Sequence, residues 1–518
     1  MIAYRALRAL GGLALRWFYR EIEVIGMERL PVEGPMLLAS NHPNALVDAL
    51  VVGCVLPRPV VLTAKATLLE NPITRLLVRT VGVVPLRRAS DAIPAGSGGV
   101  LDPARNADAF AAVLDALEAG GIVLLFPEGK SHSDPALAPL KTGLARMALM
   151  ARVERRLTRI PIIPIGLTFE RKWEPRSRVL MQFGTPIMCV AGVADEPNDV
   201  AALTQRVDAG LREVTLNFRS TEEAHQVLSV SSVLTDVLDT FRPLHTPDPP
   251  LVDRVRVAHR ITDIVPKLPG LELEVGVRVE QFVSRLSTFE DLLKLNALAA
   301  SDVQMSTSMA AGVWFAVREL GIASVAGPFA LWGRVNHWLP LRIARFLALR
   351  MSRTPDEPAM NTIVVGVLAV LAFYIGQVSL VTWWLGWRAA VLYAVSLPLS
   401  ATWDFRYADR LRRGVARVRT YFRFRRDTSI HQRLHEDLLW LRGEAIALDA
   451  LIGPSTGLGI LRLDFRSGQL CAVERTWCGT DQAPNESHQL GREAAEIGPQ
   501  DPNATRLAEA PFVGLSMA

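Results

Sequence analysis

The sequence predicts an α/β domain, with a mostly parallel sheet flanked by helices, followed by a helical extension and a transmembrane hairpin. Short apolar runs alternate with longer amphipathic stretches between residues 36 and 183, which is the pattern of parallel strands joined by helical crossovers. Residues 359–387 contain no charged side chain. Such a run can cross a hydrocarbon core of about 30 Å at about 1.5 Å per residue. Half of the 518 residues are hydrophobic and 21% are charged, which excludes a disordered or fibrous protein.

The predicted sheet is built from short apolar segments. Helices are expected between them, for example at 107–117 and 140–153, where apolar residues recur with helical spacing. Ligands of such sheets bind beyond the carboxyl ends of the strands, so we expect functional residues there. The predicted strands are 36–39, 60–63, 83–86, 122–126, 160–167 and 179–183.

The N-terminal segment is expected to be a basic amphipathic helix at a membrane surface. It combines leucines and arginines with Trp17, Phe18 and Tyr19, a composition typical of the bilayer interface. A helix packed on its own domain is the alternative. Because arginines interrupt the apolar run, we expect no cleavable secretory signal.

Two uncharged runs, 359–387 and 389–403, predict the hairpin, with a short second arm. Arginines lie on both flanks, and residues 404–426 contain nine arginines and two aspartates. Positive flanks favour the cytoplasmic side, either of a bacterial inner membrane or of the endoplasmic reticulum, so the α/β domain is expected there. A buried hairpin in a soluble core is the alternative. The shorter apolar run 320–332 is expected to be interfacial or buried.

The four cysteines are too few and too scattered for a disulfide framework or a four-thiolate zinc site, so we expect a reducing compartment and no metal.

The patterns of charge and hydrophobicity divide the chain into six predicted segments. The segments are a membrane-associated helix (1–20), the α/β domain (21–217), the helical extension (218–357), the hairpin (358–403), a basic helical segment (404–466) and a disordered tail (467–518).

A histidine and an aspartate follow the first predicted strand. His42 and Asp48 would lie on different faces of a regular helix, because successive residues are about 100° apart. They can meet only if the chain turns between them, and Pro43 and Asn44 are turn residues. An aspartate on one ring nitrogen leaves the other nitrogen available as a general base. A helix-capping aspartate beside an unrelated histidine is the alternative.

Cations follow two later strands, where an anionic substrate would bind. Arg87 follows one strand, and Glu128, Gly129, Lys130 and Ser131 follow another. Arginine binds phosphate as a planar fork and lysine binds it as a point charge. Solvated loop cations without a ligand are the alternative. A nucleotide-binding loop is excluded, because its required first glycine is replaced by leucine at position 124.

Taken together, these blocks resemble the glycerol-phosphate and lysophospholipid acyltransferases over roughly residues 20–215. The Asn-His block, the block ending at Arg87, the Phe-Pro-Glu-Gly block and the apolar strand 160–166 occur in the family's order. Five residues separate His42 from Asp48, whereas most members have four. This variant resembles the fungal glycerol-3-phosphate and dihydroxyacetone-phosphate branch. Lys130 and Ser131 stand where many members have Thr-Arg or Arg.

The resemblance implies that an acyl thioester, either acyl-coenzyme A or acyl carrier protein, donates to glycerol-3-phosphate in phospholipid biosynthesis, without a cofactor. His42, held by Asp48, would deprotonate the acceptor hydroxyl. Arg87 and Lys130 would neutralise the acceptor phosphate, and Glu128 would orient another hydroxyl or the loop. Lysophosphatidate or another lysophospholipid is the alternative acceptor.

Three other interpretations are weaker. Residues 453–457 match a serine-hydrolase elbow around Ser455, but little chain follows to build the surrounding sheet. The arginine-rich segment 404–426 could bind nucleic acid, although after a hairpin we expect it to set topology, with no nucleic-acid partner. His431 and His435 have metal-binding spacing without an identifiable third ligand.

Overall fold

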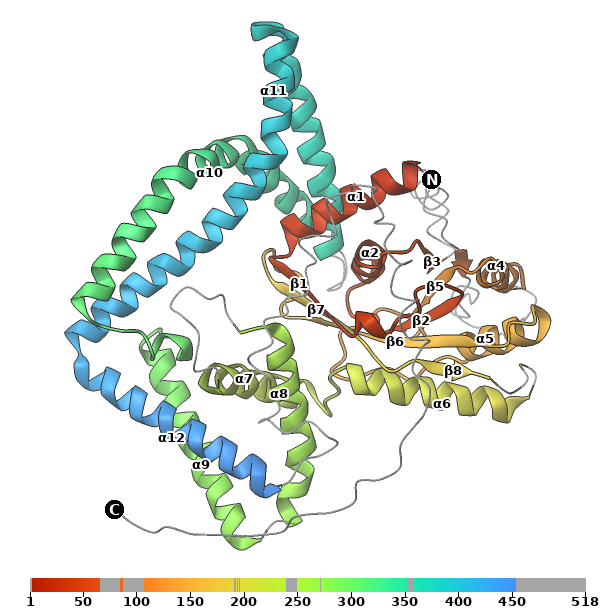
Figure 1. Ribbon diagram of the computed structural model, residues 1–518, viewed down its shortest axis with the longest axis horizontal. Helices are drawn as coiled ribbons and strands as arrows, with labels where there is room; N and C mark the ends of the chain where they lie inside the picture. The colour runs from red at the N-terminus through yellow and green to blue at the C-terminus, as the bar shows by residue number, and fades with distance from the viewer. Residues whose placement is uncertain are drawn as a thin grey trace, which may run out of the picture. The chain divides into compact units, whose positions relative to one another are not determined.

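The computed structural model describes residues 2–65, 84–86, 107–190, 192, 194, 196–238, 249–270, 272–352 and 358–452. Its centre is an eight-stranded mixed sheet in which most neighbouring strands run parallel (Figure 1). The strands are β1 (Glu21–Ile25), β2 (Met36–Ser40), β3 (Val60–Lys65), β4 (Val84–Leu86), β5 (Ile122–Leu125), β6 (Ile160–Phe169), β7 (Arg178–Phe183) and β8 (Ile187–Cys189).

The strand order is β1-β7-β6-β2-β5-β3-β4, and β8 also pairs with β6. Only the pairs β6·β7 and β6·β8 are antiparallel among the pairs described. All six predicted strands are present, which confirms the fold class, while β1 and β8 were not predicted. The central strands β2, β5 and β6 place the loop after β2 between two neighbouring strand ends.

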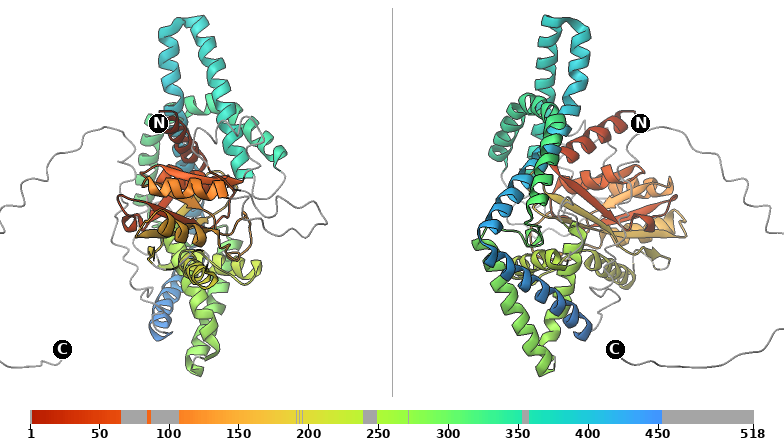
Figure 2. Two further views of the ribbon diagram at one scale, coloured as in Figure 1. Left: turned by 90° about the vertical axis from the view of Figure 1, so that its right-hand side faces the viewer. Right: turned by 60° about the vertical axis from the view of Figure 1, so that its left-hand side comes forward.

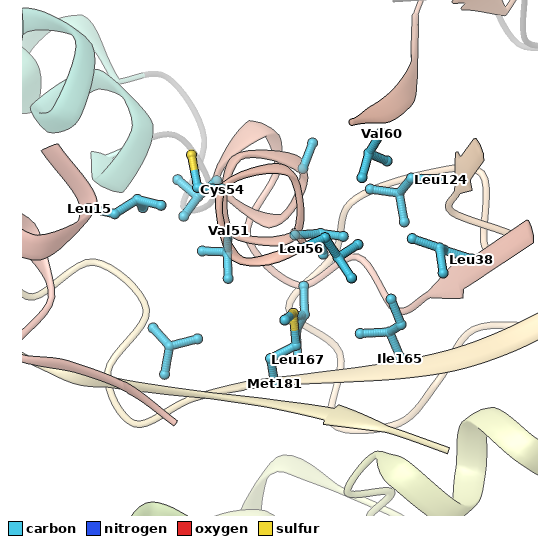
Figure 3. Close-up of a cluster of buried hydrophobic side chains, with 14 of the residues drawn as sticks. Leu15, Leu38, Val51, Cys54, Leu56, Val60, Leu124, Ile165, Leu167 and Met181 are labelled. Atoms are coloured by element: carbon cyan, nitrogen blue, oxygen red, sulfur yellow. The ribbon is translucent and has the colours of Figure 1, made fainter. Parts of the chain in front are cut away.

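Side chains of the central strands alternate between two apolar layers, as the period of two in a strand requires. Met36 and Leu38 of β2 pack toward α1 (Ile2–Phe18) and α2 (Leu46–Val55), in the cluster drawn in Figure 3. Leu37 and Ala39 pack on the opposite face. The helices covering that face are α4 (Ala107–Glu118), α5 (Gly143–Glu154) and α6 (Pro197–Val214).

Helix α1 packs on its own domain through part of its surface. Leu15 and Phe18 join the core cluster beside α2, and the Trp17 ring lies 5.9 Å from that of Phe405. Arg5 and Arg16 remain exposed. The packing alternative therefore holds for the buried face of α1, and its membrane association stays a prediction.

The segment after the sheet is helical, as predicted for residues 218–357. Phe289 and neighbouring apolar side chains form a separate cluster, to which α7, α9, α11 and α12 contribute. The helices are α7 (Thr221–Leu238), α8 (Leu251–Ile264), α9 (Leu273–Leu295), α10 (Met309–Met351), α11 (Pro358–Arg426) and α12 (Thr428–Ile452).

Helix α11 reverses direction at Gly386, whose φ of 83° and ψ of 169° are not helical. Its two arms run side by side (Figure 2), matching the expected hairpin. The second arm does not end at residue 403, because the helix continues through the arginine-rich segment. Two described helices, α10 and α11, are long and apolar enough to cross a membrane, judged by length and composition.

The apolar run 320–332 is not the short block that we expected. It belongs to the 43-residue helix α10, and Val325, Phe329 and Leu331 are exposed rather than buried. The periodicity of the short run failed to show that the helix continues through Pro328 and Pro340. Cys54 and Cys189 are free and buried, while the predicted tail 467–518 lies outside the described residues.

Candidate active site

His42 and Asp48 meet through a turn in the loop between β2 and α2. The Nδ1 atom of His42 lies 2.9 Å from Oδ2 of Asp48. Ala45, immediately before α2, has φ 48° and ψ −132°, a backbone conformation that L residues rarely adopt. This turn brings the histidine back over the first turn of α2, which a regular helix could not do.

Asp48 is fully buried, and its Oδ2 also accepts the Asn44 backbone N–H at 2.8 Å. Burial raises the pKa of the Asp48 carboxyl, and the hydrogen bond and charge of His42 oppose that shift. The Oδ1 atom has no hydrogen-bond partner among the described residues. The carboxylate is thus directed at the imidazole and at one main-chain amide.

The His42 ring is stacked on Phe126, with centroids 3.9 Å apart and planes at 15°. Its side chain is 12% exposed. Because Asp48 engages Nδ1, the other ring nitrogen, Nε2, is the one available to a substrate, and no described residue hydrogen-bonds it. A histidine held in this way by a carboxylate can act as a general base.

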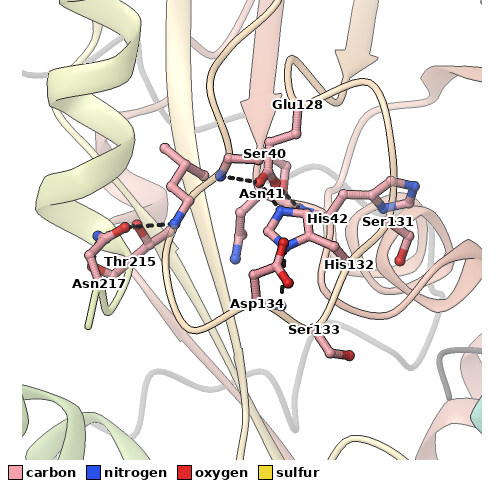
Figure 4. A network of polar contacts seen from close by, with 12 residues as sticks. Ser40, Asn41, His42, Glu128, Ser131, His132, Ser133, Asp134, Thr215 and Asn217 are labelled. Atoms are coloured by element: carbon pink, nitrogen blue, oxygen red, sulfur yellow. Dashed lines mark hydrogen bonds and ion pairs between the residues drawn. The ribbon is translucent and has the colours of Figure 1, made fainter. Parts of the chain in front are cut away.

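Glu128 holds the histidine loop from the neighbouring strand end (Figure 4). Its Oε1 accepts the His42 backbone N–H at 2.8 Å, and its Oε2 accepts the Ala138 N–H at 2.9 Å and contacts His132 Nε2. The backbone N–H of His132 in turn donates to the backbone carbonyl of His42. Both carboxylate oxygens are therefore occupied by protein groups, which favours positioning of the loop over contact with an acceptor hydroxyl.

Of the other predicted site residues, the structure describes three near His42 and does not describe Arg87. Ser131 Oγ accepts the Ala45 N–H at 3.0 Å, so this hydroxyl supports the strained turn. Gly129 has φ 74°, which glycine adopts readily. Lys130 is exposed beside it. Arg87 lies outside the described residues, as does Ser455 of the possible hydrolase elbow.

Sequence reasoning missed the second support of the histidine loop. Asn44 Nδ2 donates to Tyr19 Oη at 3.3 Å and to the Lys172 carbonyl at 3.1 Å. The Asn41 side chain pairs with the Leu167 main chain in both directions, at 2.7 and 3.0 Å. The two asparagines beside His42 were the available signal, but their partners are more than 20 residues away.

The loop after β6 brings an additional cation near the site. Lys172 Nζ donates to Ser133 Oγ at 3.2 Å, and the charge of Lys172 lowers the pKa of Asp48 in opposition to burial. In the described part of the chain, no three His, Cys, Asp or Glu side chains cluster in a way that could hold a metal ion. His431 and His435 have ring centroids 6.4 Å apart, without a third ligand in that part.

Comparison with known proteins matches residues 21–168 to the family described as Acyltransferase. Over 117 residues the chain is 34% identical to glycerol-3-phosphate O-acyltransferase 2 of Saccharomyces cerevisiae, covering 22% of this chain and 16% of that protein. It is 23% identical over 326 residues to an uncharacterized acyltransferase of Schizosaccharomyces pombe, covering 45% and 48% of the two chains. A chloroplastic 1-acyl-sn-glycerol-3-phosphate acyltransferase of Brassica napus is 26% identical over 151 residues, covering 29% and 38%.

The part of the α/β domain between residues 21 and 168 therefore matches the acyltransferase family, as the sequence blocks indicated. This domain contains the whole cluster formed by His42, Asp48 and Glu128. The chain spans less than half of the length of each of these three relatives, between 16% and 48%.

Proposed function

We propose that the protein is a membrane-associated glycerolipid O-acyltransferase that moves a fatty acyl group from an acyl thioester to the hydroxyl of glycerol-3-phosphate. The observation that carries this proposal is the contact between His42 Nδ1 and Asp48 Oδ2, 2.9 Å apart, inside an acyltransferase-family domain. The contact leaves Nε2 as the proton acceptor.

In the proposed reaction, His42 Nε2 takes the proton of the acceptor hydroxyl while the hydroxyl oxygen attacks the thioester carbonyl. The tetrahedral intermediate then expels the thiolate, and the imidazolium returns the proton to the sulfur. Asp48 stabilises the imidazolium and fixes its tautomer. General-base catalysis of this kind contributes about 10² to 10⁴ in rate. The step needs neither a metal nor a nucleophilic serine, and the thioester is a co-substrate from coenzyme A or acyl carrier protein.

The acceptor phosphate requires cations near the imidazole. Lys130 is exposed beside Gly129 in the loop that holds His42, and Arg87 is our second candidate from the sequence. Glu128 acts as a positioning residue, because protein donors occupy both of its oxygens. Ser131 has the same role through the Ala45 amide.

Glycerol-3-phosphate is our preferred acceptor for two reasons. His42 and Asp48 are separated by five residues, which resembles the fungal glycerol-3-phosphate branch, and the yeast relative carries that substrate in its name. Lysophosphatidate is the second candidate, because the Brassica napus relative is named for 1-acyl-sn-glycerol-3-phosphate.

The apolar helices support the proposed membrane location. Helices α10 and α11 have the length and composition to cross a bilayer, and many of their large apolar side chains are exposed, including Trp383, Trp384 and Leu392. Water-exposed apolar surface of this extent is costly. We place the acyltransferase domain on the cytoplasmic face, because arginines flank the hairpin on both sides.

Nucleic-acid binding by the arginine-rich segment 404–426 has less support. Arg410 pairs with Glu319 at 2.8 Å, and Arg412 pairs with Asp409 at 3.0 Å. The Arg410 pair joins α11 to α10, whereas the Arg412 pair lies within α11, and guanidinium groups engaged in ion pairs are less available to phosphates.

The test of the proposed function is product identification. Purified full-length protein is incubated with a labelled acyl thioester and, in separate reactions, glycerol-3-phosphate, dihydroxyacetone phosphate or lysophosphatidate. We expect labelled lysophosphatidate from glycerol-3-phosphate. Labelled phosphatidate from lysophosphatidate alone would assign the second candidate, and no transfer to any acceptor would overturn the proposal.

A further inference from the structure

A cavity of about 330 Å³ lies between α1, α10, α11 and the loop that joins β6 to β7. This volume is at the lower end of ordinary ligand sites, which span about 300 to 1,000 Å³. Its walls are mostly apolar, with Leu13 and Trp17 from α1, Leu341 from α10, and Val367 and Val370 from α11. The cavity is therefore suited to a hydrocarbon chain.

One position in the wall opens directly onto empty space. Gly366 of α11 lines the cavity, and a Cβ atom added there would meet nothing within 4 Å. Gly376, farther along the same helix, also has open space at its Cβ position but does not line the cavity. The two glycines thus form a matched pair for testing what the cavity holds.

Arginines surround this apolar space, and they fall into two groups. Arg334 is paired with Asp404 at 2.9 Å, and Arg412 with Asp409 at 3.0 Å. Arg342 and Arg345 also line the cavity, three residues apart on α10. Both are exposed, and neither forms an ion pair with a described residue.

We propose that this cavity binds an anionic glycerophospholipid, with one acyl chain in the apolar space and the phosphate on Arg342 and Arg345. A free phosphate ion would leave the apolar walls unused, and an uncharged lipid would leave the two guanidinium groups unused. Arginine is suited to phosphate because its planar fork donates two hydrogen bonds.

The aromatic residues at the cavity fit the same ligand. Trp338 lies under the Arg342 guanidinium, 5.5 Å from the ring centroid, and Trp17 closes the side formed by α1. Tryptophan and arginine together are typical of the headgroup level of a bilayer. The lipid would thus enter from the membrane surface, where α1 meets α10 and α11.

The site is separate from the cluster around His42 in the residues that form it. The loop between β6 and β7 connects them, because Arg176 lines the cavity while the carbonyl of Lys172 accepts a hydrogen bond from Asn44. Lipid binding requires no turnover, so it can be measured whether or not the proposed reaction is correct.

The test is equilibrium binding of labelled dioleoyl phosphatidate to the full chain in neutral detergent. Gly366→Leu places a side chain in the cavity, and Arg342→Gln with Arg345→Gln removes both cations. We expect each change to weaken binding about tenfold or more, which corresponds to about 1.4 kcal/mol. The arginine variant loses charge-assisted hydrogen bonds to the phosphate, and the Gly366→Leu side chain occupies space that the acyl chain needs. The His42→Ala variant should bind phosphatidate as the wild type does.

The controls carry the same substitutions outside the cavity. Gly376→Leu and Arg350→Gln should leave the dissociation constant within about twofold, and leucine suits a helix interior better than glycine does. Equal affinity for dioleoyl phosphatidylcholine, or full competition by inorganic phosphate, would overturn the proposed ligand. Wild-type affinity in Gly366→Leu would overturn the proposed place of the chain.

Discussion

The region around His42 and the helical segment are each stabilised by a different kind of contact. Around His42, single side chains bind main-chain amides of neighbouring loops, as Glu128 and Ser131 do. In the helical segment, helices distant in the sequence are joined by side-chain ion pairs, as Arg260 and Asp449 join α8 to α12 at 2.8 Å. The first arrangement fixes a loop conformation, and the second fixes the packing of whole helices. The same kind of substitution should therefore affect activity in one region and stability in the other.

The largest expected effect is on activity in Asp48→Asn. The asparagine oxygen can accept the Asn44 amide, but the amide group no longer stabilises an imidazolium or fixes the same tautomer. Acyl transfer should fall by about 10² to 10⁴, measured as kcat/KM with glycerol-3-phosphate. Asp291→Asn, an exposed change on α9, is the control and should keep full activity.

Stability should not follow activity in this variant. Burial raises the pKa of Asp48 in the folded protein, so the wild type loses stability as the pH rises through that pKa. Asp48→Asn lacks this loss, and its free energy of unfolding relative to the wild type should increase as the pH rises above about 4, the ordinary pKa of an aspartate. A lower unfolding free energy than the wild type at neutral pH would show that the charge of Asp48 supports the fold.

Asp449→Ala should produce the largest loss of stability. Arg260 and Asp449 are each 5% exposed, and removing one partner of a buried pair costs about 3–5 kcal/mol. Denaturant unfolding should show this loss, while acyl transfer below the unfolding transition stays near that of the wild type. A double variant, Arg260→Met with Asp449→Leu, should recover much of the stability. If acyl transfer fell as far as stability, the two regions would not be separable.

Glu128→Gln should affect both quantities moderately. Glutamine has one acceptor oxygen, so its amide nitrogen would face either the His42 or the Ala138 N–H. An unmet buried donor costs about 1–3 kcal/mol, and the displaced histidine loop should lower kcat more than it changes KM. Glu213→Gln, exposed on α6, is the matched control. An unchanged kcat and melting temperature in Glu128→Gln would remove its positioning role.

The smallest effect is expected for Asp208→Asn on the surface of α6. Arg212 and Asp208 pair at 2.6 Å but are 44% and 31% exposed. Solvent screening limits such pairs to about 0.3–0.5 kcal/mol, which thermal unfolding should place within experimental scatter. A loss as large as that of Asp449→Ala would show that burial does not set the cost of breaking a pair.

The local sequence was sufficient to predict most strands, the turn after His42 and the hairpin. The apolar runs predicted six strands, and the need for a turn between His42 and Asp48 predicted the bend found at Ala45. Strand β1 was missed because its Glu21 and Glu23 interrupt the apolar run, although they alternate with isoleucine and valine. The hairpin was predicted from its lack of charge, and its turn falls at Gly386.

Contacts between distant residues left no local signal. Tyr19, the residue after α1, hydrogen-bonds Asn44, and Arg176 pairs with Asp409 across 233 residues. Both depend on how α1 and α11 pack, which neither periodicity nor composition determines. Residues 404–426 were predicted to be helical, but their continuity with the second arm of the hairpin was missed, because the change from apolar to arginine-rich composition at residue 403 resembles a segment boundary.

The most direct test of the central claim compares His42→Ala with His225→Ala, an exposed histidine change on α7, in a single-turnover assay with acyl thioester and glycerol-3-phosphate. If His42 is the general base, its variant should lose about 10² to 10⁴ in the rate of ester formation while the protein is still folded at the assay temperature. The control should react at the wild-type rate. A His42→Ala protein that transfers acyl groups as fast as the wild type would contradict the assignment of this site.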